Sequence, residues 1–408
     1  MQRLGIIGCG LRSNAYMVHL KDGLGTDWDV AGLADPNPKA VDYFRDEYAA
    51  PSTPAFPSGP EMLDALAGRL DAVIIGSPNA LHRESLLPAL EQNLKILLEK
   101  PVATTMADMK AIWSAYEAAG KPSVPVGFVL RYTGFYRKVQ EVLDSGRLGT
   151  LFSIHATEEM GPSLTALYMR GWRRNTAVAG PLLAEKCSHD IDLLNAFAGG
   201  RPVRISSFSG LTRFVPMPNA SDHCRDCTYQ DSCRYSTKHS TPYMIDAKRT
   251  AAPLRRMMAE NDLCVYNSDK NIPDHQSVLL DYENSVTVTF TVSMDQPRTN
   301  RHIKITGSDA TLTGNLSDDR LSLEYHGRPG TDDPQHESFV IAHDDSGHHG
   351  GDSVISDYFK AMLKGTPNPP PAGLQEGIES CLVCLAAQVA ADTGRVIDVP
   401  PYYTKIFG

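Results

Sequence analysis

Short apolar runs alternate with helical patterns through the first 125 residues. Residues 3–7 form an apolar run, followed by glycines and then by apolar positions at the 3.6-residue period of a helix. Further apolar strands are predicted at 28–34, 72–76 and 94–98, with an amphipathic helix between the last two. This alternation predicts an α/β fold, a doubly wound parallel sheet that binds ligands at the carboxyl ends of its strands.

A different pattern follows residue 126. Apolar and polar residues alternate with period two and β-branched residues are frequent, as in antiparallel strands with one buried face. We therefore predict a Rossmann domain at 1–125 and an α+β domain with a large, mostly antiparallel open sheet at 126–408. The alternating segments are 149–159, 203–214, 275–294, 301–316 and 320–326, with a loop predicted at 327–351 and a helix at 374–394.

Composition and charge narrow the class of partner. Of 408 residues, 42% are hydrophobic and 21% charged, which is typical of a soluble globular protein. The formal net charge of −9 disfavours nucleic acid and anionic membranes as partners, so we expect a small-molecule ligand. The first residues run directly into an apolar strand without the features of a signal peptide, and we expect a cytoplasmic protein.

Glycines and a carboxylate mark the first strand–helix unit as a nucleotide site. Gly8 and Gly10 occupy the first two places of a GxGxxG phosphate-binding turn, with Ser13 in the third. Asp35 ends the next strand, where a carboxylate accepts hydrogen bonds from a ribose diol and repels a 2′-phosphate. NAD is therefore favoured over NADP. The turn residues expected to line the cofactor are Gly8, Gly10, Leu11 and Arg12.

Polar residues also follow the third and fourth strands. Asn79 lies in the turn after the third strand, and Lys100 follows the fourth. Because the carboxyl ends of parallel strands meet at one edge of a sheet, both side chains are expected at the cofactor site. Further residues assigned to this site are Ser77, His82 and Glu99.

Five motifs, in this order and spacing, resemble those of the Gfo/Idh/MocA family of NAD(P)-dependent sugar oxidoreductases: GIIGCG, ADPNP, SPNALH, EKPVATT, and GFVLRY followed by FYRKVQEVLDSGRLGTL. The resemblance covers nearly the whole chain. It implies that Lys100 lies near the nicotinamide and the substrate hydroxyl, before a peptide bond that is often cis. It also implies a carbohydrate substrate and a homodimer or homotetramer built on the open sheet. The alternative for Lys100 is a surface lysine at a strand end.

The stretch GPLLAEKCSHDIDLLNAF, residues 180–197, is predicted to be a helix with two polar faces. Glu185 and His189 are one turn apart, with Asp192 near the same face, and Lys186 and Asp190 form a parallel pair. The first face resembles a family motif, with glutamate in place of the usual aspartate. The second is either an ordinary ion pair or additional proton-transfer machinery.

The chemistry of carbinol oxidation assigns roles to these residues. A base must take the hydroxyl proton while hydride leaves the same carbon, and a neutral imidazole suits this task. We predict His189 as the acid/base, Lys100 as its partner and Glu185 as an orienting group, with Lys186 as a further catalytic candidate. A core histidine is the alternative for His189. A catalytic metal is disfavoured, because the helix carries no HExxH-like arrangement.

Basic and aromatic residues provide candidate substrate contacts. The segment YMRGWRR carries Trp172, Arg173 and Arg174; guanidinium groups bind carboxylate or phosphate, and aromatic rings pack on sugar faces. A solvated loop is the alternative. The segment HDDSGHHGGDSVISDYF resembles the family segment that returns a histidine and an aspartate toward the active site, here His348 or His349 with Asp352. Asp352 also suits the N-cap region of the helix that follows, which requires no substrate. The predicted substrate residues are Arg131, Tyr132, Trp172, Arg173, Arg174, His189 and His348.

Four cysteines fall in a predicted insertion at about 215–273. Their Cys-x2-Cys-x5-Cys spacing plus a distant fourth thiol suits a structural zinc site, in which His223 or His239 can replace a cysteine. Unligated thiols and an iron–sulfur cluster remain alternatives. The candidate zinc ligands are Cys224, Cys227, Cys233 and Cys264.

Three functional classes stay open on the sequence. The first is an NAD-dependent dehydrogenase that oxidises a sugar or polyol. The second is an NAD-dependent glycosidase that oxidises C3 transiently, eliminates the aglycone, adds water and re-reduces the sugar, for which Lys186 and Asp190 would supply proton transfers. The third is a cofactor-binding sensor without turnover.

Overall fold

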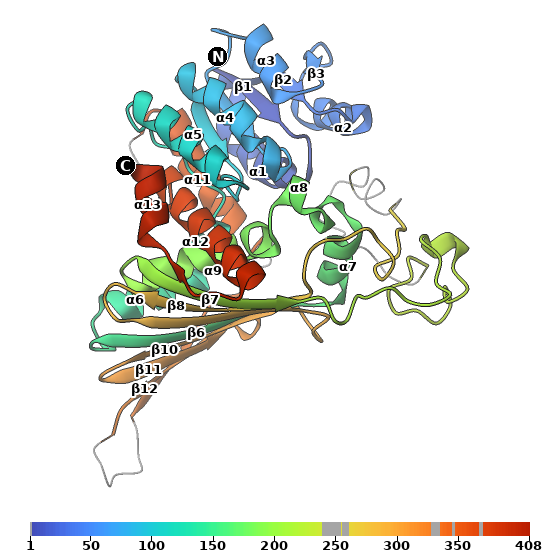
Figure 1. Ribbon diagram of the computed structural model, residues 1–408. Helices are drawn as coiled ribbons and strands as arrows, with labels where there is room; N and C mark the ends of the chain where they lie inside the picture. The colour runs from blue at the N-terminus through green and yellow to red at the C-terminus, as the bar shows by residue number, and fades with distance from the viewer. Residues whose placement is uncertain (1, 239–253, 255–260, 328–334, 345–346, 367–369) are drawn as a thin grey trace.

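The computed structural model describes residues 2–238, 254, 261–327, 335–344, 347–366 and 370–408 (Figure 1). In this part of the chain the predicted parallel sheet has strand order β3-β2-β1-β4-β5. β3 was not predicted from the sequence, because two residues are too short to carry a periodic pattern. The strands are β1 (Gln2–Ile7), β2 (Trp28–Ala34), β3 (Ala55–Phe56), β4 (Ala72–Ile75) and β5 (Lys95–Leu98), and the helices between and after them are α1 (Leu11–Leu24), α2 (Pro38–Tyr48), α3 (Gly59–Ala65), α4 (His82–Glu91) and α5 (Met106–Ala118).

The second sheet confirms the predicted open, mostly antiparallel architecture. Its described strands run in the order β13-β12-β11-β10-β6-β9-β8-β7-β14, and of their pairings the one between β6 and β9 is parallel. The strands are β6 (Leu151–Met160), β7 (Pro202–Gly210), β8 (His275–Tyr282), β9 (Thr287–Met294), β10 (Asn300–Gly307), β11 (Ala310–Asn315), β12 (Arg320–Tyr325), β13 (His336–Val340) and β14 (Ile397–Asp398).

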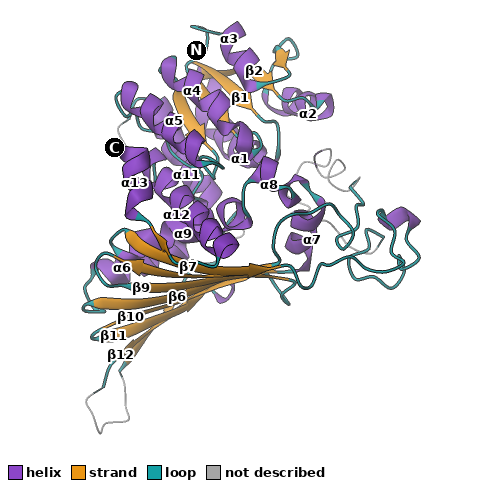
Figure 2. Ribbon diagram, viewed as in Figure 1, coloured by secondary structure: helices purple, strands orange, loops and turns teal. Residues whose placement is uncertain are grey.

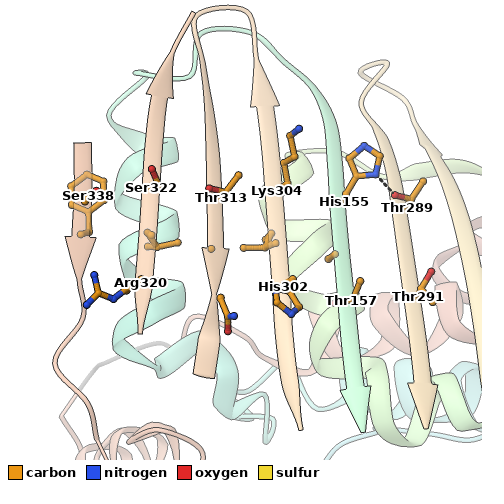
Figure 3. A pocket seen from close by; sticks show the side chains of 16 residues that line it. His155, Thr157, Thr289, Thr291, His302, Lys304, Thr313, Arg320, Ser322 and Ser338 are labelled. Carbon is orange, nitrogen blue, oxygen red and sulfur yellow. Dashed lines mark hydrogen bonds between the residues drawn. The ribbon is translucent and has the colours of Figure 1, made fainter. Parts of the chain in front are cut away.

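The two faces of this sheet differ. Helices α6 (Gly134–Asp144), α9 (Leu182–Ala198) and α12 (Leu374–Thr393) pack on one face and share an apolar core with it (Figure 2). The opposite face is a shallow open groove of about 630 Å³. Figure 3 shows histidine, threonine, serine, lysine and arginine side chains along it, with His155 and Thr289 hydrogen-bonded across neighbouring strands. The period-two alternation therefore separates a helix-covered face from an open one.

The carboxyl-terminal part of the chain returns to the parallel sheet. Helix α11 (Gly351–Leu363) packs against α1, and Ile355 and Phe359 are buried in the same apolar cluster as Leu4 and Tyr16. Helix α13 (Pro400–Phe407) packs against α5. The predicted domain boundary at residue 125 thus assigns α11 to the second domain, although α11 packs into the apolar core of the first. None of the described helices is long and apolar enough to cross a membrane.

Candidate active site

The glycine turn after β1 brings three strand ends close together. Gly8 has a φ of +84°, and a Cβ on it would lie 2.5 Å from the carbonyl oxygen of Gly76 at the end of β4. Gly10 is the N-cap of α1, and an added Cβ there would meet no described atom within 4 Å. The open backbone at a helix N-terminus is suited to a pyrophosphate. Residues with side chains would close this space.

Two hydroxyls and one carboxylate surround this turn. The Ser13 and Ser77 hydroxyl oxygens are buried and have no hydrogen-bond partner among the described residues. The Asp35 carboxylate accepts hydrogen bonds from the backbone N–H groups of Cys9, at 2.9 Å, and Asn37, at 2.8 Å, which orient it at the end of β2. Buried polar atoms normally have partners. These orphaned hydroxyls, the glycine cradle and the oriented carboxylate fit a dinucleotide cofactor.

Residues after β4 and β5 are tied to each other and to the second half of the chain. His82 places Nδ1 2.8 Å from the Pro101 carbonyl oxygen and Nε2 3.0 Å from that of Ser77, so its ring joins the two strand ends. The Asn79 amide donates to the Ala179 carbonyl at 2.7 Å. These two predicted cofactor residues therefore hold the loops of the site in position.

Lys100 lies between the parallel sheet and helix α9. The Lys100–Pro101 peptide bond is cis, as the resemblance implies, and Lys100 Nζ donates to the backbone carbonyl of Glu185. Burial lowers the pKa of Lys100, against the opposing charges of Glu185 and Glu99. Lys100 is therefore a part-buried lysine directed at the polar helix and not a solvated surface lysine.

Helix α9 supplies a carboxylate that stays ionised. Glu185 is 3% exposed, accepts a 2.7 Å hydrogen bond from Arg173 Nε and accepts another from the Tyr168 hydroxyl. Burial raises its pKa, but the charges of Lys100 and Arg173 and these hydrogen bonds bring the pKa of Glu185 down to about 2. Tyr168, from α7 (Pro162–Arg170), was not predicted as this partner.

His189, one turn along the same helix, is a neutral imidazole. It is 6% exposed, and its Nδ1 atom is buried without a hydrogen-bond partner in the described structure. Burial, followed by the charges of Lys100 and His348, lowers the pKa of His189 well below its usual value. Its ring centroid lies 6.0 Å from that of Phe128 and 6.2 Å from that of His348. The imidazole is therefore able to accept a proton at neutral pH.

The ion pair between Lys186 and Asp190, one of the two alternatives for this face, is not formed, because each residue has another partner. Lys186 Nζ lies 2.8 Å from Glu158 on β6, whereas Asp190 Oδ1 lies 2.7 Å from Arg301 Nε on β10. Arg301 also contacts Glu158, its cross-strand neighbour, at 2.7 Å. Lys186 and Asp190 therefore belong, with Glu158 and Arg301, to a network of four charged residues between α9 and the sheet. Glu158 falls on the inward, otherwise apolar, register of its strand, and this signal was available in the sequence.

Arg12 and Arg131 both pair with carboxylates. Arg12, predicted at the cofactor, lies 2.8 Å from Glu99 and 2.8 Å from Asp352, and thereby joins β5 to α11. Arg131, predicted at the substrate, forms two hydrogen bonds with Asp192 on α9, one at 2.7 Å, and the adjacent Tyr132 is buried. Each guanidinium neutralises a buried carboxylate, and a contact of either one with a ligand stays a prediction.

The basic–aromatic segment divides between the site and the insertion. Arg173 packs over Trp172, 4.5 Å from the ring centroid, and binds Glu185. Arg174 instead pairs with Asp269 at 2.6 Å, and Arg170 donates to the Leu263 carbonyl at 2.7 Å. Of the three arginines, Arg173 alone reaches Glu185, while Arg170 and Arg174 anchor the insertion.

His348 lies at the start of α11, where the two halves of the molecule meet. Its Nδ1 is 3.0 Å from Asp352 and 3.3 Å from Arg12. Burial raises the pKa of Asp352, but the charges of Arg12 and His348 reverse this effect and hold the pKa well below its usual range. The His348 ring therefore faces His189 from an ionic cluster anchored in both halves.

The cysteines of the insertion surround one small cavity of about 20 Å³. Their sulfurs do not form a compact ligand set, because among the described residues a single group of three or more potential ligands has its ligating atoms within 4.8 Å of one another, and it contains no cysteine. His239 and its neighbours lie outside the described residues. The residues lining the cavity include Cys224, Cys227, Cys233 and Cys264.

Two family models match the chain, one over the parallel sheet and the other over the part of the second sheet that precedes β12. One, described as an oxidoreductase family with an NAD-binding Rossmann fold, matches residues 2–128, and the other, the GFO/IDH/MocA C-terminal domain, matches residues 136–313. The chain belongs to the Gfo/Idh/MocA family of oxidoreductases. The resemblance carried by the five motifs is thereby confirmed.

Members of the Gfo/Idh/MocA family show how far the similarity extends. YteT of Bacillus subtilis is 23% identical over 86% of this chain and 87% of its own length. The inositol 2-dehydrogenase of Leifsonia xyli is 31% identical, but the match spans 37% of this chain and 41% of that protein. A solved levoglucosan dehydrogenase in complex with NADH and L-sorbose has a TM-score of 0.73 at 17% identity, covering 98% of this chain and all of the other. The fold is shared over its full length.

Proposed function

We propose that this protein is an NAD-dependent dehydrogenase that oxidises a carbinol carbon of a sugar or polyol. The observation that carries the proposal is the arrangement of Lys100, Glu185 and His189. Lys100 follows β5 of the parallel sheet, its Nζ binds the Glu185 backbone, and its charge acts on His189; Glu185 and His189 are buried and Lys100 is part-buried. Inositol and levoglucosan dehydrogenases among the relatives support a polyol or sugar as substrate.

The cofactor site is proposed from the residues around the glycine turn. Gly8, Gly10 and Leu11 would hold the pyrophosphate, and Asp35 would accept hydrogen bonds from the adenosine ribose. Its negative charge favours NAD over NADP. Bound NAD would accept the hydride from the substrate carbon. Ser77, Asn79 and Glu99 remain candidates for cofactor contacts at the strand ends. His82 instead holds the loops after β4 and β5 together through the Ser77 and Pro101 carbonyls.

The proton chemistry falls to the groups on and opposite α9. His189 would take the hydroxyl proton, since its lowered pKa keeps the imidazole neutral. The Lys100 ammonium would stabilise the negative charge that develops on the substrate oxygen. Glu185 stays ionised and anchored by Arg173, which positions it to orient the substrate or the lysine. Of the predicted substrate residues, Arg173 and His348 stay beside these groups.

The glycosidase alternative relied on Lys186 and Asp190 for its additional proton transfers, and both residues are engaged in ion pairs. Lys186 and Asp190 are neutralised by Glu158 and Arg301, so neither is a free acid or base for additional proton transfers. Lys186 is therefore not retained in the proposed catalytic set. An assay with aryl glycosides at trace NAD still separates the two reactions, because aglycone release without NADH accumulation would contradict the dehydrogenase.

His189→Ala tests the proposed role directly. The variant is expected to lose turnover by about 10²- to 10⁴-fold, the usual contribution of a general base, while binding NAD as the unmodified protein does. NADH formation with a panel of sugars and polyols measures the first effect, and calorimetric titration with NAD measures the second. His19→Ala, on α1 about two turns beyond the glycine turn, is the control. Equal loss in both variants, or none in His189→Ala, would refute the assignment.

We also propose self-association through the open sheet face, as a homodimer or homotetramer. Phe208 on β7 and Leu279 on β8 support this, since they are 70% and 50% exposed and lie on that same face. Structural zinc at the four cysteines remains a prediction. Because their sulfurs are not gathered within 4.8 Å of one another, ligation would require the insertion to contract around the metal.

A further inference from the structure

A cluster of two histidines and one aspartate lies outside the proposed reaction centre. One ligating atom from each of Asp319, His343 and His349 lies within 4.8 Å of the other two. The three residues come from the turn before β12, the segment after β13 and the segment before α11. Residues that are 24 and 30 positions from Asp319 in sequence are therefore held together by the tertiary structure.

The backbone keeps two of these side chains in place. Asp319 has a φ of +50°, and its carbonyl accepts a 2.8 Å hydrogen bond from the Ile341 N–H group, which closes the end of the β12–β13 pair. His349 has a φ of +51° and follows His348, with a φ of +49°. Left-handed conformations are uncommon in residues other than glycine. Here they direct successive imidazoles to different partners: His348 to Arg12 and Asp352, and His349 to this cluster.

An ordinary histidine–aspartate hydrogen bond explains only part of the cluster. His343 Nδ1 contacts Asp319 Oδ2, and such a pair requires no third member. His349, however, has a buried Nδ1 atom for which the described structure provides no hydrogen-bond partner. A buried polar atom left unpaired is unfavourable, so the imidazole that completes the cluster lacks a partner within the described residues.

We propose that Asp319, His343 and His349 form a binding site for a first-row transition-metal dication such as Zn²⁺. Two imidazoles and a carboxylate are the ligand types that such ions prefer, and three protein ligands leave coordination positions for water. The ion would fasten the segment that precedes α11 to the base of the β12–β13 pair. Because that segment carries His348, the metal would stabilise the loop that faces His189. The site stands independently of the proposed reaction.

The experiment uses the full chain, stripped of metal with a chelator and titrated with Zn²⁺ by calorimetry. The unmodified protein is compared with His343→Ala and His349→Ala. His275→Ala is the matched control, because His275 is half exposed and bonded to Asp274 at 2.7 Å without a place in the cluster. Titration with Co²⁺ separates this site from the cysteines, since thiolate ligation gives intense near-ultraviolet charge-transfer bands and nitrogen–oxygen ligation does not.

The expected result is one binding event that both cluster variants lose or weaken by more than about tenfold, and that His275→Ala retains. Zn²⁺ should also raise the melting temperature of the unmodified protein and of the control, but not of the cluster variants. If either histidine variant fails to fold without metal, Asp319→Asn serves in its place. Unchanged affinity in the variants, or binding accounted for entirely by thiolate ligation, would overturn the proposal.

Discussion

At the scale of single residues, Glu185 shows how its surroundings decide the role of an acidic group. Its position one helical turn from His189 was predictable from the sequence. Which groups the longer glutamate side chain contacts, in place of the usual aspartate, was not. The structure supplies Tyr168 and Arg173 for its two oxygens, while Lys100 binds its backbone carbonyl. These partners hold the carboxylate ionised although it is buried, and so make it a fixed negative charge within the site.

Glu185 should therefore contribute stability that depends on pH. Its pKa is about 2 in the folded protein against an ordinary 4.5, so its contribution is complete above about pH 4.5 and is lost as the pH falls toward 2. The difference in unfolding free energy between the unmodified protein and Glu185→Gln should shrink by about 3 kcal/mol over this range. Denaturant titrations at successive pH values measure it. Glu141→Gln, an exposed carboxylate paired with Lys138, is the control, and a pH-independent difference for Glu185→Gln would contradict the prediction.

At the scale of secondary-structure elements, the sheet on which α9 packs supplies the partners of the charged residues on one face of that helix. The 3.6-residue period correctly separates the Glu185 and His189 face from the Lys186 and Asp190 face. The antiparallel register of β6 and β10, however, places Glu158 opposite Arg301 and beneath the second face. Interactions between helix and sheet therefore replace the expected interaction within the helix.

Removing the central cation of this network should be strongly destabilising. Arg301→Met leaves Glu158 and Asp190 buried with one positive charge, Lys186, in place of two, and we expect a loss of about 3 kcal/mol or more in unfolding free energy. Chemical denaturation provides the measurement. Arg298→Met, which removes a 59% exposed arginine from a surface pair, should change stability by less than about 1 kcal/mol. Similar values for the two variants would show that the buried network contributes little.

At the scale of the whole molecule, α11 packs a segment from the C-terminal part of the chain against α1 near the N-terminus. The helix completes the apolar core around α1, while Asp352 in its first turn pairs with Arg12 from the glycine-turn helix. The same turn is preceded by His348, which faces His189. The proposed cofactor site and the proposed proton acceptor are thus linked through one ionic cluster between the two halves.

Asp352→Asn should weaken this connection. The substitution leaves the buried Arg12 with Glu99 as its remaining carboxylate, and we expect a loss of about 3 kcal/mol in stability together with lower kcat, because His348 is no longer held. Thermal unfolding and steady-state kinetics provide the two measurements. Asp357→Asn changes an exposed aspartate on the same helix that pairs with Lys360, and it should alter neither property. A variant of Asp352 that melts and turns over like this control would contradict the proposed link.

Local patterns predicted the architecture better than they predicted partners. Strands, helices and the two faces of α9 follow from periodicities of two and 3.6 residues, which reflect the burial of each segment against its immediate surroundings. The contacts that were not predicted are made by charged residues whose partners are distant in sequence. Arg131 pairs with a carboxylate 61 positions away, Arg301 with one 111 positions away and Arg12 with one 340 positions away. No periodic signal links such pairs.

The sequence by itself determined the parallel and antiparallel sheets, the glycine turn, the family resemblance, and the presence of Lys100, Glu185 and His189 as candidate chemical groups. The tertiary structure alone decided which charges are neutralised and which stay open to a ligand. It assigned Arg12, Arg131, Lys186 and Asp190 to ion pairs and, within the described part of the chain, left Nδ1 of His189 without a hydrogen-bond partner. The physical reason is that hydrophobic periodicity is a local property, whereas electrostatic pairing depends on packing between distant segments.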